Sequence, residues 1–355
     1  MAREGTVDAP LRVVLADDSA LYREEMARTL RRVGIEVAEA ANGEQAVAAT
    51  CERRPHVVLM DVRMPVMDGL EAIRQVMARC PTPILVLTGI DATEIDAVAM
   101  EALACGALEV APKPTTLPVA DAELQVITER LQLLASVSVV RHPRANRKKR
   151  EELVVEHRSD VRLLAVAAST GGPSALATIL AGVPASLPVP LLVAQHLDPE
   201  FARSLTAWLD SSTSLRVVLA EDGQRLEPST AYVIPPERDA EVNESLVISL
   251  KAPADPHRLS SPSADRLFRS MATALGRRAC GVVLTGMGRD GSQGLLAIRR
   301  AGGITFAQDA ASSAVDGMPR AARDLRAAQA VLSLDEVASA LVRVAESGAS
   351  WRPPP

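Results

Sequence analysis

The sequence predicts an α/β protein made of two doubly wound domains, each built on a mainly parallel sheet. Short apolar runs alternate with amphipathic stretches along residues 11–134, and the same alternation resumes along residues 161–348. Residues 135–160 lie between them and break the pattern, because they are rich in basic side chains. The chain length of 355 residues independently favours two or three domains.

Composition excludes several classes of protein. Apolar residues make up 48% of the chain but aromatic residues only 2%, so aliphatic side chains must fill the cores. The net charge of −5 argues against nucleic acid as a partner. No apolar run reaches the length of a membrane span and residues 1–10 do not form a signal peptide, so we expect a cytoplasmic protein without membrane insertion. Residues 1–10 and 351–355 are expected to be disordered tails.

The four cysteines are far apart in the sequence and fit neither a zinc site nor a disulfide framework. We therefore expect them to be reduced core residues of a cytosolic protein. They are Cys51, Cys80, Cys105 and Cys280.

Five strand–helix units account for the first domain. The expected strands are residues 11–16, 37–39, 56–60, 84–87 and 108–110. The expected helices are residues 20–33, 43–53, 69–79, 93–105 and 119–135. Five such units predict a doubly wound parallel sheet, whose functional residues lie beyond the carboxyl ends of its strands.

That rule selects five polar side chains in the first domain. Asp17 and Asp18 follow the first strand, Asp61 the third, Thr88 the fourth and Lys113 the fifth. Three carboxylates at adjacent strand ends form an oxygen-rich site suited to Mg²⁺. A lysine and a hydroxyl beside them could hold a phosphoryl group.

Each of these pieces also has an ordinary structural interpretation. Residues 17–19 could form a turn and a helix cap, a lone lysine is usually solvated, and residues 68–69 are expected to be a turn. The peptide bond between Lys113 and Pro114 is a candidate cis bond that would help to orient the lysine.

The linker contains the segment RHPRANRKKREE, with six Lys or Arg residues between positions 141 and 150. Its charge and its proline favour a flexible, solvated tether. The alternative is a regulatory strap that contacts one domain or an acidic partner.

Strands and helices alternate again in the second domain, and predict a mainly parallel α/β fold. The expected strands are residues 163–168, 189–194, 217–219, 231–233, 246–250, 281–284, 304–307 and 330–332. The three from 217 to 250 could form a meander or a hairpin, and the last is expected at the sheet edge. The expected helices are residues 173–181, 199–209, 263–275, 294–300, 316–326 and 334–347.

The stretch LLAVAASTGGP, residues 163–173, is the strongest local signal in the chain. An apolar strand ends on Ser169 and Thr170, turns at Gly171 and Gly172, and continues into a helix with Pro173 in its first turn. Backbone N–H groups at a helix N-terminus favour developing negative charge, so Ser169 is a candidate nucleophile. The alternative is that one of the two hydroxyls merely caps the helix.

The strand-end rule brings Ser169 together with His196 and Asp290, each in a loop that follows a central strand. An imidazole can remove the proton of a serine hydroxyl, and a carboxylate can orient the imidazole and stabilise its charged form. The chain order and the absence of a G-x-S-x-G motif disfavour a standard α/β-hydrolase. Asp290 could instead be a turn residue, and residues 285–291 could instead cradle phosphate, although they lack the P-loop pattern.

Specific motifs in the first domain carry a resemblance. LADDS, LMDVRMPVMDGLEA, Thr88 after ILVL, and Lys113 before a proline resemble the flavodoxin-like receiver domains of two-component systems. The resemblance implies that a histidine kinase phosphorylates Asp61 and that Asp17, Asp18 and Asp61 hold Mg²⁺. Lys113 would pair with the phosphoryl group, and Thr88 would hydrogen-bond it as part of a switch.

ASTGGP, AQHLDPEF, PSADRLF, VVLTGMGRDG and GGITFAQDAASSAVDGMPRAA, in this order, resemble the catalytic domain of the chemotaxis protein-glutamate methylesterases, the CheB family. The resemblance implies a Ser169, His196 and Asp290 triad that needs no cofactor. It would hydrolyse glutamate γ-methyl esters on chemoreceptor helices and deamidate receptor glutamines. The backbone N–H groups of Thr170, Gly171 and Met287 are candidates for holding the oxyanion.

The same resemblance implies that the unphosphorylated receiver covers Ser169 and that phosphorylation of Asp61 releases it. Two features depart from the family pattern, namely Asp316 before GMP and the prolines Pro235 and Pro236. They leave open a hydrolase of the same chemistry with a substrate other than a chemoreceptor. A further alternative is a receiver joined to a non-catalytic adaptor.

Overall fold

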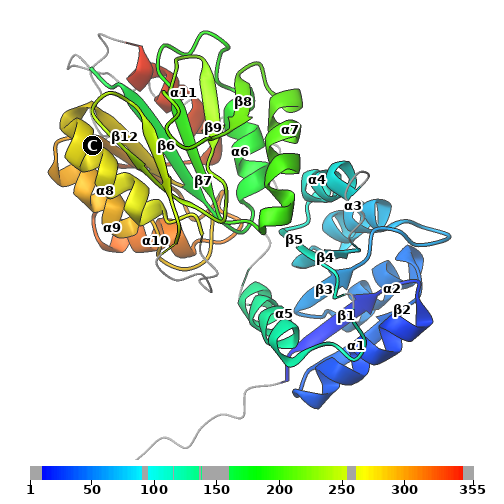
Figure 1. Ribbon diagram of the computed structural model, residues 1–355. Coiled ribbons are helices and arrows are strands. Elements are labelled where there is room, and N and C mark those ends of the chain that lie inside the picture. The colour runs from blue at the N-terminus through cyan, green and yellow to red at the C-terminus, as the bar shows by residue number, and fades with distance from the viewer. Residues whose placement is uncertain are drawn as a thin grey trace, which may run out of the picture. The chain divides into compact units, whose positions relative to one another are not determined.

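The computed structural model describes residues 10–89, 95–114, 116–135, 137, 160–253 and 261–346. The chain divides into two compact units, Met1–Arg141 and His142–Pro355, and each is an α/β unit (Figure 1). No helix in the described residues is both long enough and apolar enough to cross a bilayer.

The first unit contains a five-stranded parallel sheet with the strand order β2-β1-β3-β4-β5. Its strands are β1 (Arg12–Ala16), β2 (Glu36–Ala40), β3 (Val57–Met60), β4 (Ile84–Thr88) and β5 (Glu109–Pro112). Its helices are α1 (Ala20–Arg32), α2 (Gly43–Arg53), α3 (Gly69–Arg79), α4 (Ile95–Cys105) and α5 (Asp121–Ala135). This order confirms the predicted flavodoxin-like sheet.

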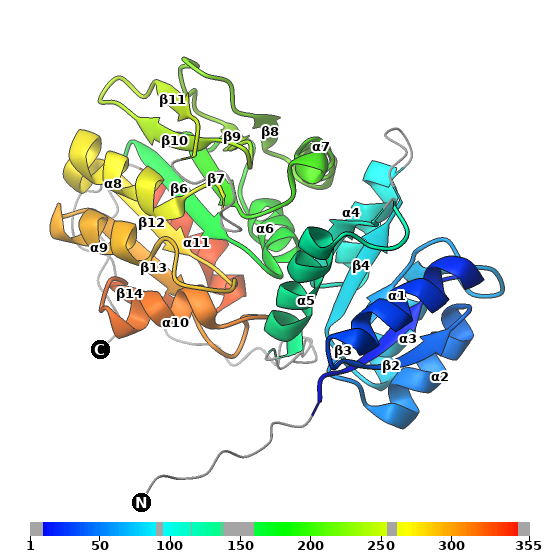
Figure 2. The same cartoon turned by 60° about the horizontal axis from the view of Figure 1, so that its bottom comes forward.

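Apolar, β-branched runs explain why the central strands of this sheet form. β3 is the segment VVLM, and every residue of it is buried. Helices α1 and α5 pack together on one face of the sheet, and α2, α3 and α4 pack in sequence on the other (Figure 2). Burial on both faces is the usual arrangement of a parallel sheet.

The second unit contains a seven-stranded parallel sheet with the order β14-β13-β12-β6-β7-β9-β8. Its strands are β6 (Leu163–Ala168), β7 (Leu191–Gln195), β8 (Arg216–Leu219), β9 (Thr230–Val233), β12 (Ala279–Val283), β13 (Ile304–Gln308) and β14 (Ala330–Leu332). The mainly parallel fold and the edge position of β14 confirm the prediction.

Helices cover both faces of this sheet as well. Helices α8, α9 and α10 lie on one face, and α6, α7 and α11 on the other (Figure 2). The helices are α6 (Gly172–Ala181), α7 (Ala202–Ser212), α8 (Ala264–Leu275), α9 (Ser292–Arg300), α10 (Gly317–Asp324) and α11 (Leu334–Ala345), with 3₁₀ turns at Pro199–Phe201 and Gly276–Arg278.

The short strands between residues 216 and 251 differ from the predicted meander or hairpin. β8 and β9 pair in parallel within the main sheet, with α7 packed against β8. A separate antiparallel hairpin joins β10 (Asp239–Val242), which the sequence did not indicate, to β11 (Ile248–Lys251). β10 is the four-residue run DAEV, which alternates polar and apolar residues but is too short and too rich in acidic residues to indicate a strand.

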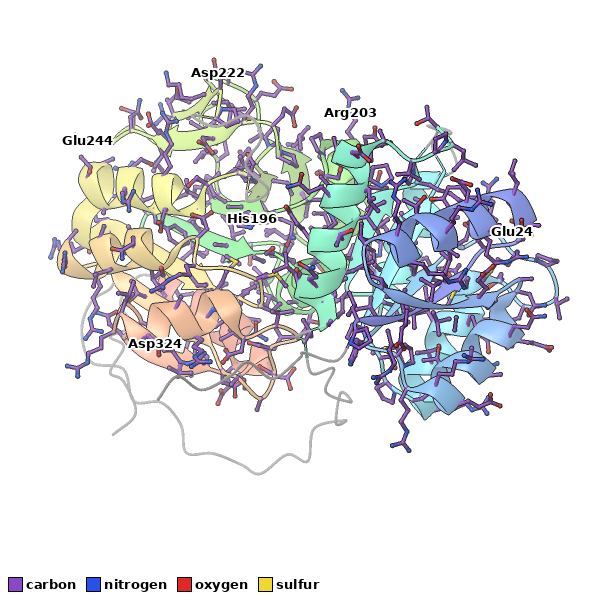
Figure 3. All side chains as sticks on the ribbon, turned by 90° about the horizontal axis from the view of Figure 1, so that it is seen from below. Glu24, His196, Arg203, Asp222, Glu244 and Asp324 are labelled. Atoms are coloured by element: carbon purple, nitrogen blue, oxygen red, sulfur yellow. A yellow bond between two sulfur atoms is a disulfide. The ribbon has the colours of Figure 1, made fainter. Side chains whose placement is uncertain are left out.

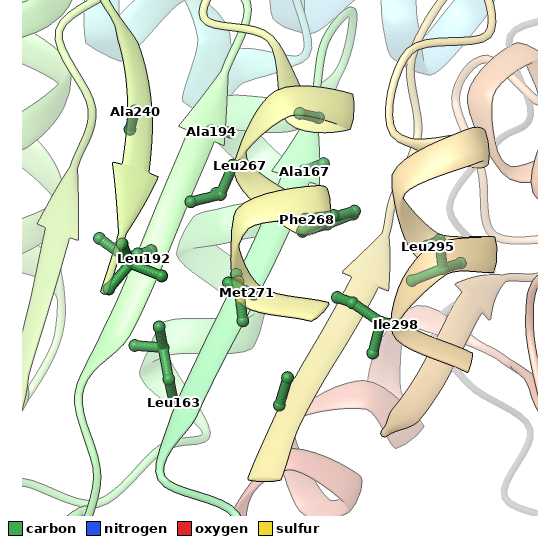
Figure 4. Packing of buried hydrophobic residues seen from close by; sticks show 14 of the residues in the cluster. Leu163, Ala167, Leu192, Ala194, Ala240, Leu267, Phe268, Met271, Leu295 and Ile298 are labelled. Carbon is green, nitrogen blue, oxygen red and sulfur yellow. The ribbon is translucent and has the colours of Figure 1, made fainter. Parts of the chain in front are cut away.

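Aliphatic side chains fill the core, as the composition requires. Leu267, Phe268 and Met271 of α8 point toward the sheet, beside Leu295 and Ile298 of α9 (Figure 4). All six residues of β6 are buried. All three phenylalanines of the chain are buried and contribute to this core.

Two predictions about the first unit are wrong. Cys51 and Cys80 form a disulfide with their Cα atoms 5.3 Å apart, because the packing of α2 on α3 brings together residues 29 apart in sequence. Cys105 and Cys280 are free. The bond between Lys113 and Pro114 is trans, and the cis bond of that loop joins Leu117 to Pro118.

Candidate active site and phosphorylation site

Ser169 directly follows β6, the central strand of the seven-stranded sheet. This strand pairs with β7 on one side and β12 on the other. Its backbone N–H donates to the carbonyl of Thr285 (3.0 Å), and the N–H of His196 donates to the carbonyl of Ala168 (3.0 Å). The loops after three adjacent strands therefore meet at one place, which we call the Ser169 edge.

The turn after Ser169 excludes the helix-cap interpretation. The N-cap of α6 is Gly171, in a left-handed conformation with φ of +74°, and no side chain caps the helix. In the described part of the chain, no group hydrogen-bonds the Ser169 hydroxyl. A side chain at Gly286 would place its Cβ 2.7 Å from the Ser169 Cβ, so the loop can approach the serine only as glycine.

His196 and Asp290 form a hydrogen-bonded pair beside Ser169. The His196 Nε2–H donates to Asp290 Oδ2 at 2.9 Å, and the imidazole is almost fully buried. Figure 3 shows His196 within the second unit, whereas Asp222, Glu244 and Asp324 lie on its outside. Since an ionised carboxylate can only accept, this bond fixes the hydrogen on Nε2 and leaves Nδ1 as the basic nitrogen.

Asp290 is held by the N-terminus of α8. Its Oδ2 accepts from the N–H of Ala264 (2.8 Å), and its Oδ1 accepts from the N–H of Asp265 (3.0 Å) and the hydroxyl of Ser263 (3.3 Å). Burial raises the pKa of the Asp290 carboxyl. The hydrogen bond and charge of His196 and the two N–H groups outweigh burial, so its pKa is lowered overall.

Ser263 opens the predicted helix over residues 263–275, and it is the N-cap of α8, because its hydroxyl accepts from the N–H of Arg266. That the same helix end holds Asp290 was not predicted. The available signal was a serine at the helix start in the motif PSADRLF, which the fold then places opposite the loop that carries Asp290.

The three oxyanion candidates lie in the loops of the Ser169 edge. Among the described residues, none accepts a hydrogen bond from the backbone N–H of Thr170, Gly171 or Met287. The Thr285 hydroxyl donates to the carbonyl of Thr170 (3.0 Å) and so joins the two loops. Unused donors beside a serine hydroxyl are the groups that an oxyanion requires.

Asp316 is held by contacts with other residues of the second unit. Its Oδ2 pairs with Arg323 at 2.5 Å, its backbone bridges to Gly286, and its Oδ1 is buried with no partner among the described residues. Pro235 and Pro236 are both buried after β9. Of the basic linker, residues 135–160, the described residues include only Ala135, position 137 and Asp160.

The acidic cluster of the first unit lies at the corresponding edge of its sheet. Asp17, Asp18 and Asp61 each offer a carboxylate oxygen, and these oxygens lie within 4.8 Å of one another. Lys113 Nζ donates to Asp61 Oδ2 at 2.9 Å and also pairs with Asp17 Oδ2. A compact set of hard oxygen donors fits Mg²⁺.

Two further residues position Lys113. Its backbone N–H donates to the carbonyl of Thr88 (2.8 Å), the buried last residue of β4. The ring of Tyr22 lies 4.3 Å from the ammonium, a cation–π contact that sequence analysis missed. Burial raises the pKa of the Asp17 carboxyl, against the hydrogen bond and charge of Lys113.

An acidic cluster with a lysine on a five-stranded parallel sheet, joined to a unit with a serine, histidine and aspartate at one sheet edge, defines a class of protein. It is a response regulator with a hydrolase as its output domain. A family model described as "Response regulator receiver domain" matches residues 13–125, and one described as "CheB methylesterase" matches residues 164–341. The chain belongs to the CheB methylesterase family.

The relatives extend over nearly the whole chain. A protein-glutamate methylesterase/protein-glutamine glutaminase of Anaeromyxobacter dehalogenans is 43% identical, over 94% of this chain and 97% of its own length. A protein of the same description from Hahella chejuensis is 39% identical, over 93% and 97%. The Thermotoga maritima CheB methylesterase catalytic domain aligns with 30% identity and a TM-score of 0.49, covering 51% of this chain and 97% of that one.

Proposed function

We propose that Ser169, His196 and Asp290 form the catalytic triad of a protein-glutamate methylesterase that also deamidates glutamine. The observation that carries the proposal is the imidazole of His196, hydrogen-bonded to the partly buried carboxylate of Asp290 at the sheet edge where Ser169 follows the central strand. The descriptions of the relatives supply the substrate, a glutamate γ-methyl ester. The protein that carries it is a methyl-accepting chemoreceptor.

The chemistry proceeds through two tetrahedral species. Ser169 Oγ attacks the ester carbonyl carbon while Nδ1 of His196 takes the hydroxyl proton, and the carbonyl oxygen becomes an oxyanion. The free N–H groups of Thr170, Gly171 and Met287 stabilise that charge. Asp290 stays ionised, because its pKa is lowered, and stabilises the imidazolium.

The first species then collapses. The C–O bond to the methoxy group breaks, the imidazolium of His196 protonates the leaving oxygen, and methanol departs. Water, deprotonated by the same nitrogen, attacks the acyl-enzyme, and Ser169 leaves with the proton returned to it. With a glutamine side chain, the group that leaves is ammonia.

Asp61 is the regulatory site of the proposal. A chemotaxis histidine kinase supplies its phosphoryl group. Asp17, Asp18 and Asp61 would hold Mg²⁺, which would neutralise negative charge on the phosphoryl oxygens. The ammonium of Lys113 then pairs with the phosphoryl charge, and Thr88 hydrogen-bonds it. The resulting population shift raises esterase activity.

In this proposal residues 11–134 form the receiver and residues 161–348 the methylesterase domain, and residues 135–160 link them. The protein acts in the cytoplasm, where the signalling helices of chemoreceptors lie.

Release of methanol tests the proposed activity. Radiomethylated receptor membranes are incubated with the full chain and with Ser169→Ala, each with a small phosphodonor. We expect methanol from the wild type alone, and equal release by Ser169→Ala or none by the wild type contradicts the proposal. In a parallel test of regulation, Asp61→Asn should keep basal release and lose the stimulation by the phosphodonor.

A further inference from the structure

We propose that Gln195 is a positioning residue of the Ser169 edge. Its side-chain amide ties the main chain of Ser169 to that of His196 and so sets the separation between nucleophile and base. The inference rests on the proposed function, in which these two residues have those roles.

The amide of Gln195 bridges two carbonyl groups. Its Nε2 donates to the carbonyl of Ser169 (2.9 Å) and to the carbonyl of His196 (2.8 Å), which uses both hydrogens of the NH₂ group. Gln195 is the last residue of β7 and pairs with Ala168, the last residue of β6. The bridge therefore spans the point where the two strands separate into loops.

The two carbonyl groups determine the orientation of this buried amide. Gln195 is 2% exposed, and a rotated amide would direct its Oε1 at two carbonyl oxygens. In its present place Oε1 is buried without a partner among the described residues. An unpaired buried oxygen lowers stability, and such groups gather where a site requires them.

The neighbouring helix leaves room for the amide. A Cβ at Gly172 would lie 2.0 Å from Oε1, so only glycine at this position allows Gln195 to reach both carbonyls. The Gly172 N–H also donates to the Ser169 carbonyl at 2.7 Å. The ASTGGP and AQH motifs are thus joined through a single side chain.

Positioning matters here because no direct bond joins the Ser169 hydroxyl to the imidazole among the described contacts. Their approach in the reaction depends on where the two main chains are held. A displacement of about 1 Å in such a pair lowers the rate on the order of 100-fold.

A purely structural role is the competing explanation, and the chain offers a matched control. Gln329 also bonds a neighbouring strand through its amide, since its Oε1 accepts from the N–H of Thr305 at 3.0 Å. It lies beside β13, and its hydrogen bonds among the described residues go to Thr305, outside the Ser169 edge. Gln329→Met should therefore lower stability without lowering turnover.

The experiment compares the full-length wild type with Gln195→Met, Gln195→Asn and Gln329→Met, below the melting temperature of each. Methanol release gives kcat and KM, and the rate of inactivation by a phosphonofluoridate reports the reactivity of Ser169 without any receptor. For Gln195→Met we expect kcat and the inactivation rate to fall about 10- to 100-fold, with KM changed less than about 3-fold.

Gln195→Asn keeps one amide on a shorter side chain and should fall between wild type and Gln195→Met, and it decides the question if the Met variant does not fold. A kcat within about 2-fold of the wild type in the folded Gln195 variants overturns the inference. An equal loss in Gln329→Met also overturns it, because the effect would be general destabilisation. A wild type that releases no methanol contradicts the proposed function instead, and the inactivation rates then still test Gln195.

Discussion

Replacing Asp290 by asparagine separates the two things that this carboxylate supplies, orientation and charge. From the described residues the side chain accepts four hydrogen bonds, donated by His196, Ala264, Asp265 and Ser263. Asparagine keeps one accepting oxygen and turns the other into a donor. The donor fits best at the Oδ1 position, because the Ser263 hydroxyl can turn to accept from it.

In that arrangement the imidazole keeps its partner oxygen, and only the N–H of Asp265 faces another donor. One buried N–H left unpaired costs about 1–3 kcal/mol of unfolding free energy. The loss of the negative charge affects catalysis more, because the imidazolium formed in the transition state is no longer stabilised. We expect kcat to fall about 10³- to 10⁴-fold, with KM nearly unchanged.

The assay is methanol release by the phosphodonor-activated full chain, with Asp265→Asn as the matched control. The Asp265 carboxylate binds the N–H of Gly294 at 2.7 Å, and its substitution leaves its backbone bond to Asp290 in place. The control should stay within about 5-fold of the wild type. A drop of less than about 10-fold in Asp290→Asn would refute the role of this carboxylate as the partner of the base.

The lowered pKa of Asp290 also predicts how stability depends on pH. A carboxyl with a lower pKa in the folded state binds fewer protons there than in the unfolded state. It therefore stabilises the fold above its ordinary value of 3.8 and loses that contribution as the pH falls below it. In urea unfolding, the stability difference between wild type and Asp290→Asn should shrink on acidification, and a constant difference would contradict the shift.

Three other predictions concern residues whose surroundings are well defined. Gly286→Ala should lower kcat about 100-fold, because its Cβ would collide with Ser169 and Met318, and a normal rate would show that the loop moves freely. Chelation of Mg²⁺ should abolish phosphorylation of Asp61 by a small phosphodonor, as followed by phosphoprotein gel, and leave basal methanol release intact. Under oxidising conditions, Cys51→Ser should lower the unfolding free energy of the first unit by about 3 kcal/mol, and reductant should lower that of the wild type equally.

The positions of Ser169, His196 and Asp290 could be predicted because they depend on the order of the strands alone. Each lies in the loop after an apolar run, and such runs can be recognised in the sequence. Parallel strands place their carboxyl ends at one edge of the sheet. Ser169 and His196 are 27 positions apart and His196 and Asp290 are 94 apart, yet the three could be grouped without any knowledge of contacts. The acidic cluster of the first unit followed from the same reasoning.

The supports of the site could not be predicted, because they are bonds between side chains and the main chain of distant segments. Nothing local distinguishes Gln195 from any polar residue that ends a strand. The start of α8 near Ser263 was predicted, but the bond from Ser263 to Asp290 depends on how α8 packs beside the loop after β12. The Cys51–Cys80 bond has the same origin, since helix packing rather than spacing creates it.

The central position of β6 has a consequence for local unfolding of the second unit. A strand paired on both sides and buried along its whole length exchanges its amide hydrogens only when the entire sheet opens. Ser169 keeps its position when strand ends fray, when the hairpin of β10 and β11 opens, or when the edge strand β14 detaches. Hydrogen exchange should therefore rank β6 among the slowest segments, and a partly opened molecule keeps its nucleophile until the second unit unfolds as a whole.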